Sequence, residues 1–145
     1  MKRDHAWIAA HIPHQGAMCL LDSVEQWDQD EIVCRASSHR RADNPLRAGG
    51  QLGITNGIEF AAQAMAVHGA LLAASDAPPA VGFLTSVRDV QWQRSRLDDI
   101  GGDLLVHAQR LSGNADSLLY QFNLRTDDAV VLSGRASVMI KAPPI

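Results

Sequence analysis

Apolar side chains recur at every second position through most of the second half of the chain. The alternation runs through four successive segments, residues 81–92, 103–111, 117–126 and 129–140. Within 117–126, four large apolar side chains fall on one face: Leu118, Tyr120, Phe122 and Leu124. A period of two is typical of strands that bury one face. The pattern therefore predicts an antiparallel sheet with one buried and one open face.

The last of these segments, 129–140, assigns five residues to the buried face: Val130, Leu132, Ala136, Val138 and Ile140. Short polar stretches at 114–116 (Asn-Ala-Asp) and 127–128 (Asp-Asp) separate the strands. Asn and Asp favour tight turns, because their side chains bond the nearby backbone and tolerate left-handed conformations. We expect hairpin turns at both places.

Residues 56–74 follow a different pattern, which is apolar on nearly every side of a helix. The segment is rich in alanine and lacks proline, and a helix that is apolar all round is buried. One long buried helix and one antiparallel sheet define an α+β protein. The sheet must wrap around the helix, because the sequence offers no other element to cover it.

The first half of the chain predicts less regular structure. Residues 5–10 favour a short helical turn that ends before Pro13, and residues 23–37 favour a strand or a ragged hairpin. Residues 38–53 contain Pro45 and three glycines, which predicts a loop.

Composition narrows the class of protein. A chain of 145 residues with 46% hydrophobic and 20% charged residues suits one globular domain over 1–145. A net charge of −3 argues against nucleic-acid binding, and no apolar stretch approaches the length of a membrane span. Cys19 and Cys34 are too few for a disulfide scaffold, so we expect inert thiols and a cytoplasmic protein.

Few polar side chains interrupt the long helix, and they are the first candidates for chemistry. Glu59 and Gln63 are four residues apart and share a face, and burial is expected to raise the pKa of Glu59 toward the range of a general acid or base. The alternative is a capping box, in which Glu59 bonds the backbone of Asn56. His68 is expected to be a packed histidine. His11 and His14 are possible metal ligands, but no carboxylate or cysteine cluster completes a set, so no metal is expected.

Four segments resemble the motifs of the hotdog-fold 3-hydroxyacyl-acyl-carrier-protein dehydratases. Residues 12–24 read Ile-Pro-His-Gln-Gly-Ala-Met-Cys-Leu-Leu-Asp-Ser-Val, and residues 57–64 read Gly-Ile-Glu-Phe-Ala-Ala-Gln-Ala. Residues 97–104 read Leu-Asp-Asp-Ile-Gly-Gly-Asp-Leu, and residues 82–89 read Gly-Phe-Leu-Thr-Ser-Val-Arg-Asp. In order and spacing the match is most similar to a divergent branch associated with aryl-polyene-type lipid pathways.

The resemblance implies a hotdog fold and a dimer whose sheets join edge to edge. It implies loss of water from a 3-hydroxyacyl thioester in fatty-acid or polyene-type lipid biosynthesis. The thioester is carried on phosphopantetheine, either of acyl carrier protein or of CoA, and no cofactor is needed. In the family, a loop histidine of one subunit removes the C2 proton, and a helix carboxylate of the other subunit protonates the leaving hydroxyl. The implied site residues are Glu59 as catalytic carboxylate and Gln63, Asn56, Gly57 and Gly82 around the substrate.

The family's loop histidine has no counterpart at the expected position. Fourteen residues before Glu59 stands Pro45, flanked by Asn44, and the nearest histidine is His39. Asn44 cannot act as a base near neutral pH, so the role is either vacant or taken by His39. We therefore name Asn44 and His39 as catalytic candidates.

Two other functions remain compatible with these residues. Hotdog thioesterases often use one helix carboxylate to activate water, and a non-catalytic chain could pair with an active dehydratase. For the chain itself, we expect a homodimer or a hetero-oligomer with another hotdog protein. Five arginines could form a basic rim for an acidic carrier or could simply be a solvated charged surface: Arg40, Arg41, Arg47, Arg94 and Arg96.

Overall fold

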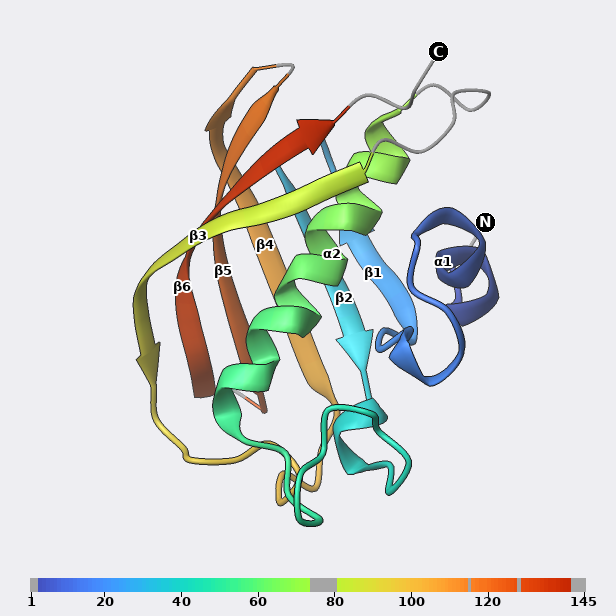
Figure 1. Cartoon of the computed structure of the whole chain (residues 1–145), viewed down its shortest axis with the longest axis vertical. Coiled ribbons are helices and arrows are strands. Elements are labelled where there is room, and N and C mark those ends of the chain that lie inside the picture. The colour runs from blue at the N-terminus through green and yellow to red at the C-terminus, as the bar shows by residue number, and fades with distance from the viewer. Residues whose placement is uncertain (1–2, 74–80, 115, 128, 142–145) are drawn as a thin grey trace.

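The computed structural model describes residues 3–73, 81–114, 116–127 and 129–141. Over these residues, six strands form one antiparallel sheet that curves around a long helix (Figure 1). The sheet order is β1-β2-β4-β5-β6-β3. The strands are β1 (Ser23–Trp27), β2 (Glu31–Ala36), β3 (Val81–Trp92), β4 (Leu104–Gly113), β5 (Ser117–Thr126) and β6 (Ala129–Lys141). This confirms the predicted α+β class and the hotdog arrangement.

The central helix is α2 (Gly57–Leu72), and the shorter α1 (His5–His11) packs beside β1. Three short 3₁₀ turns lie between the larger elements, at Gly16–Met18, Ser38–Arg40 and Ile54–Asn56. The helix begins one residue after the predicted start, because Asn56 belongs to the preceding 3₁₀ turn; residue 74 lies outside the described residues. No helix in the described ranges combines the length and apolar character that crossing a bilayer demands.

Helix α2 lies unusually close to the sheet at its first turn. A Cβ atom built on Gly57 would lie 2.6 Å from Leu132 Cδ2 and 2.9 Å from Leu124 Cδ2, well inside normal contact. Glycine is therefore needed there, and the buried alanines Ala61 and Ala64 continue the close approach. This packing fixes the position of the first turn, which carries Glu59.

The burial of side chains along β6 confirms most of the predicted alternation but differs from it at the beginning of the strand. Leu132, Ala136 and Val138 are buried as expected, but Val130 is 43% exposed and Val131 is buried. Leu124 pairs with Leu132 while Arg125 pairs with Val130, so Val131 is an extra residue in a β-bulge. The extra residue shifts the alternation by one position for the residues that precede it, which reverses the face that periodicity assigns to Val130.

The predicted turns lie where β4, β5 and β6 connect. Asn114 closes the first: its N–H donates to the Ser117 carbonyl at 2.9 Å, and its Oδ1 accepts the N–H of Asp116 at 2.8 Å. In the second, Asp127 has a φ of 50°, a left-handed conformation that Asp tolerates. Ala115 and Asp128 lie outside the described residues.

Both cysteines have free thiols and lie in the core, as predicted. Burial raises the pKa of the Cys34 thiol to about 12, and it also raises the pKa of Cys19. A thiol whose pKa is raised carries little thiolate near neutral pH and is a poor nucleophile.

Candidate active site

A carboxylate with two fixed neighbours lies at the start of α2. Glu59 is in the first turn, and its side chain is about a third exposed, at 34%. His14 Nε2 lies 3.1 Å from Glu59 Oε1, and Gln63 Nε2 lies 3.2 Å from the same oxygen. The other oxygen, Oε2, has no hydrogen bond to any residue in the described ranges. The carboxylate thus has one held oxygen and one available oxygen.

Gln63 is itself held rigidly. It is fully buried one turn after Glu59, its Oε1 accepts the backbone N–H of Leu20 at 2.9 Å, and its Nε2 donates to the Met18 carbonyl at 2.8 Å. Both hydrogens of its amide group therefore have acceptors, one of which is Glu59. The segment between α1 and β1 is bonded in this way to the central helix.

His14 is a site residue that the sequence reasoning missed. The sequence pairs it with His11 as a possible metal ligand, although Pro13-His14 stands in the motif on which the family resemblance rests. In the structure the two histidines diverge: His11 stacks on Trp7 at 3.9 Å between ring centroids, whereas His14 reaches Glu59. The described residues contain no group of three His, Cys, Asp or Glu side chains placed to hold a metal ion.

The tautomer of His14 follows from its partners. A carboxylate oxygen only accepts hydrogen bonds, so Nε2 carries the hydrogen and donates it to Glu59. The other ring nitrogen, Nδ1, is buried and has no hydrogen-bond partner within the described part of the chain.

The pKa of Glu59 lies below its usual value, contrary to the expected rise. The hydrogen bond from His14 is the largest cause; burial opposes it, and the hydrogen bond from Gln63 adds to the lowering. The prediction was wrong because desolvation was considered without the partner donors, which lie 45 and four residues away in sequence. Glu59 is accordingly ionised at neutral pH.

The capping-box alternative is also wrong. Asn56 has helical backbone angles (φ −64°, ψ −16°), and its side chain makes no capping hydrogen bond. Its backbone N–H, which Glu59 would have to reach in a capping box, donates instead to the Gly53 carbonyl at 3.1 Å. Glu59 is therefore free of a capping role.

His39 lies in the 3₁₀ turn that follows β2 and is fully buried. Its Nε2–H donates to the backbone carbonyls of Gly102 at 2.9 Å and Ile100 at 3.2 Å. Burial lowers the pKa of the imidazole. The ring thus ties the loop to the segment before β4.

Asn44 occupies a similar position in the same loop. It is buried, its Nδ2 donates to the Ser38 carbonyl at 3.0 Å, and its Oδ1 accepts the N–H of Leu46 at 2.9 Å. Each end of the amide therefore has a backbone partner. The structure does not bond Asn44 or His39 to Glu59, and their catalytic roles stay predictions.

The three predicted substrate-binding positions outside the Glu59–Gln63 pair are Asn56 in the 3₁₀ turn before α2, Gly57 in α2 and Gly82 in β3. Asn56 and Gly57 stand at the beginning of α2, where the Asn56 amide donates to the Gly53 carbonyl at 3.2 Å. Gly82 lies on β3, opposite Ile140 of β6, and a Cβ there would lie 3.1 Å from Val138 Cγ1. Their contact with substrate stays a prediction.

His68 forms a separate buried network nearer the end of α2. Its Nε2–H donates to the Asp28 carbonyl at 2.8 Å, so its Nδ1 accepts from the Tyr120 hydroxyl at 2.7 Å. Arg110 in turn donates to the Tyr120 oxygen at 3.2 Å. The polar groups of this packed histidine are satisfied, as expected for a structural role.

Four of the five predicted rim arginines form ion pairs with nearby carboxylates. Arg40 pairs with Asp103 at 2.7 Å and Arg41 with Asp43 at 2.9 Å. Arg94 pairs with Asp99 at 3.2 Å, and Arg96 pairs with Asp98.

The fifth, Arg47, donates to the backbone carbonyls of Arg41, Gly50 and His39. In the described part of the chain, the side chains of three other arginines make neither an ion pair nor a hydrogen bond: Arg88, Arg125 and Arg135. The internal ion pairs and hydrogen bonds of the five predicted rim arginines favour the interpretation of that rim as a solvated charged surface.

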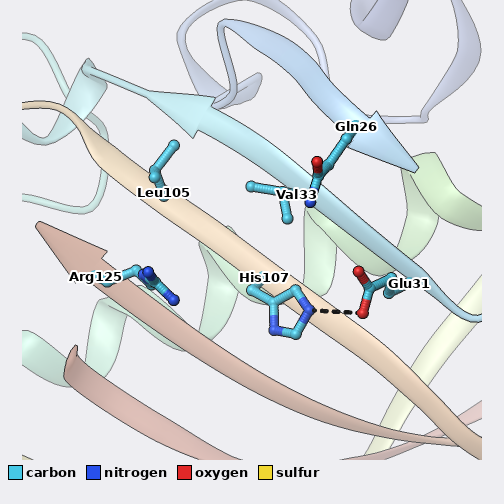
Figure 2. A pocket seen from close by; sticks show the side chains of 6 residues that line it. All are labelled: Gln26, Glu31, Val33, Leu105, His107 and Arg125. Atoms are coloured by element: carbon cyan, nitrogen blue, oxygen red, sulfur yellow. Dashed lines mark hydrogen bonds and ion pairs between the residues drawn. The ribbon is translucent and has the colours of Figure 1, made fainter. Parts of the chain in front are cut away.

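A polar hollow of about 230 Å³ lies on the face of the sheet turned away from α2. Figure 2 shows His107 of β4 pointing toward Glu31 of β2, with Arg125 of β5 beside it. His107 Nε2 lies 3.4 Å from Glu31 Oε2, and Asn123 Nδ2 lies 3.2 Å from His107 Nδ1. The hollow is separated from Glu59 by the sheet itself.

An antiparallel sheet curved around one long helix is the hotdog fold. In this chain the helix carries a carboxylate, Glu59, in its first turn. Within that class, the chain belongs to the ApeP-like family, described as ApeP dehydratase, whose sequence model matches residues 6–143. The dehydratase expectation is thereby confirmed at the level of the family. A search of curated proteins finds no match.

Solved structures of several relatives share the fold. The dehydratase heterocomplex ApeI:P from Xenorhabdus doucetiae is 21% identical, with a TM-score of 0.79 over 92% of this chain and 90% of the other. Thioesterase superfamily member 2 of zebrafish is 15% identical, with a TM-score of 0.66 over 94% and 95%. A putative thioesterase from Silicibacter sp. TM1040 is 19% identical, with a TM-score of 0.65 over 98% and 93%.

Proposed function

We propose that the chain dehydrates 3-hydroxyacyl thioesters and that Glu59 is the carboxylate that acts on the substrate. Membership of a dehydratase family supports the reaction, and the geometry of Glu59 supports the residue. The observation that carries the assignment is the division of its two oxygens, one held by His14 and Gln63 and one free of partners among the described residues. A carboxylate held in this way is ready to exchange a proton with a bound substrate.

The thioester is supplied on a phosphopantetheine arm, of acyl carrier protein or of CoA, and the reaction needs no further cofactor. An acidic carrier would meet the chain most favourably at arginines without internal partners. Arg88 and Arg135 lie opposite each other on β3 and β6 and have none among the described residues. Like charges directly opposite on a sheet repel, and an anionic partner would relieve this cost.

The assembly that we propose joins β3 to a second hotdog chain, in a homodimer or a hetero-oligomer. β3 is an edge strand, and edge strands that stay uncovered tend to pair with another chain. Phe83 and Trp92 of β3 are 51% and 54% exposed, as is Met139 of β6 at 54%. The heterocomplex ApeI:P supports a second hotdog chain of different sequence.

Substitution of Glu59 by glutamine tests the proposed function. Glutamine keeps the size and hydrogen bonding of the side chain but cannot ionise. We expect Glu59→Gln to abolish formation of the enoyl thioester from a panel of 3-hydroxyacyl-CoA substrates, alone or with a second hotdog chain. The melting temperature should stay within a few degrees, because the variant loses no capping interaction. Full activity in Glu59→Gln would remove the carboxylate from the mechanism.

Thioester hydrolysis is the second candidate function. An ionised carboxylate can activate water, and a lowered pKa of Glu59 suits this task. The two reactions differ in product, since hydrolysis releases a free acid and thiol whereas dehydration keeps the thioester. If neither product forms and the chain restores the activity of a second hotdog chain, the chain is a non-catalytic subunit.

A further inference from the structure

We propose that His14 is the positioning residue of this site: it holds Oε1 of Glu59, so that Oε2 takes the C2 proton of the substrate and then returns it to the leaving hydroxyl. This inference rests on the proposed function. It assigns both proton transfers to one carboxylate and requires no histidine in the loop 39–47.

The arrangement of hydrogen bonds orients the carboxylate. Oε1 accepts from His14 Nε2 at 3.1 Å and from Gln63 Nε2 at 3.2 Å. Two donors on one oxygen fix the plane of the group and leave the second oxygen for the substrate. Gln63 is in turn bonded to the backbone of Met18 and Leu20, so the position of the carboxylate depends on contacts beyond its own helix.

The same contacts decide which way the first proton moves. A group that accepts two hydrogen bonds is stabilised in its charged form, so Glu59 begins the reaction as a carboxylate and not as an acid. His14 Nδ1 is buried and has no hydrogen-bond partner among the described residues, so the structure shows no group to which the ring would pass a proton. The imidazole is therefore a fixed donor, and Oε2 is the base.

The proton balance closes on Glu59 alone. Oε2 accepts the C2 proton, and the electron pair of the broken C–H bond forms the enolate of the thioester. The enolate pair then forms the C2–C3 double bond as the C3–O bond breaks, and the leaving oxygen takes the proton from Oε2 and departs as water. One carboxylate serving one face of the substrate gives a syn elimination, and it ends ionised as it began.

Two variants of His14 separate positioning from structure. His14→Ala removes the donor, whereas His14→Gln keeps an N–H donor on a side chain of similar reach. With 3-hydroxyoctanoyl-CoA as substrate, we expect His14→Ala to lower kcat by about a hundredfold, as misplacement of a reacting group does. We expect His14→Gln to restore part of that loss. His11→Ala is the matched control, because His11 lies three residues earlier and contacts Trp7 instead of Glu59.

The pH profile adds a readout that a structural role would not move. A base works in its ionised form, so the rate should fall as pH decreases through the pKa of Glu59. Loss of His14 removes the main cause of the lowered pKa while burial continues to raise it, so this acidic limb should move to higher pH in His14→Ala and part of the way in His14→Gln. A rate that falls as pH increases through the same titration would make Glu59 an acid and overturn the inference.

A titration without substrate keeps this test separate from the proposed function. The Glu59 carboxyl carbon, observed by ¹³C NMR, should titrate at higher pH in His14→Ala than in the wild type and in His11→Ala. An unchanged titration would overturn the inference whatever the assay gives. Absence of enoyl product from the wild type, alone and with a second hotdog chain, would overturn the proposed function instead.

Discussion

Two histidines in this chain show how burial and partners assign different tasks to the same side chain. His14 directs its N–H to a carboxylate, whereas His39 directs its N–H to two backbone carbonyls. A carbonyl cannot ionise, so the hydrogen bonds of His39 hold a loop, while that of His14 stabilises a charge.

Removal of His39 should therefore change stability more than rate. His39→Ala leaves the carbonyls of Ile100 and Gly102 without their donor, and a buried polar group that loses its partner costs about 1–3 kcal/mol. We expect a loss of about this size in the free energy of unfolding, measured by urea denaturation, with kcat little changed where the variant is folded. A large loss of kcat at unchanged stability would show that His39 takes part in the chemistry, as the sequence-based hypothesis held.

At the scale of single elements, the first turn of α2 is the least tolerant place in the fold. Gly57 faces Leu132 and Leu124, and a methyl group there would meet the side chain of Leu132 at 2.6 Å. Accommodation would push the helix away from β5 and β6 and would move Glu59 with it.

Gly57→Ala should thus lower both stability and activity. Overpacking of a well-packed core typically costs about 1–3 kcal/mol. We expect a decrease of this size in the free energy of unfolding, together with a fall in kcat beyond what the loss of folded protein explains. Gly69→Ala is the matched control, because a Cβ at Gly69, in the same helix, meets no atom within 4 Å. Equal effects of the two substitutions would show that general helix propensity, and not the close approach, is responsible.

The elements themselves were largely predictable from local pattern. Alternation identified β3 to β6, and the alanine-rich run identified α2, because burial of one face or of a whole helix leaves a periodic trace in the sequence. The bulge at Val131 leaves no such trace, since one extra residue is invisible until the pairing with β5 is known.

The site was predictable only in part, and for a related reason. Glu59 and Gln63 lie on one helical face, so their spacing brings them together. His14 is 45 residues from Glu59, and its contact depends on how the segment after α1 packs against α2. The sign of the pKa change of Glu59 depends on that same contact, which explains why reasoning from burial alone gave the wrong direction.

At the scale of the whole molecule, the exposed apolar side chains of β3 predict self-association or association with a second hotdog chain. We expect Phe83→Lys to shift the chain from a dimer toward a monomer at micromolar concentration, measured by light scattering, because a charge on an edge strand opposes pairing. Leu111→Lys is the control, since Leu111 is 42% exposed but lies on β4, which has neighbours on both sides. A wild-type chain that is monomeric at this concentration would contradict the homodimer and leave the hetero-oligomer.

The bonds from Gln63 to Met18 and Leu20 have a thermodynamic consequence for the whole chain. They join segments 45 and 43 residues apart, so detachment of the segment after α1 would also withdraw His14 from Glu59. Segment docking and carboxylate ionisation are then linked equilibria: detachment raises the pKa of Glu59, and protonation of Glu59 weakens docking by the same free energy. A thioester that binds only the docked form would shift the equilibrium toward docking by mass action. Binding of the substrate would then favour the arrangement in which His14 orients the Glu59 carboxylate.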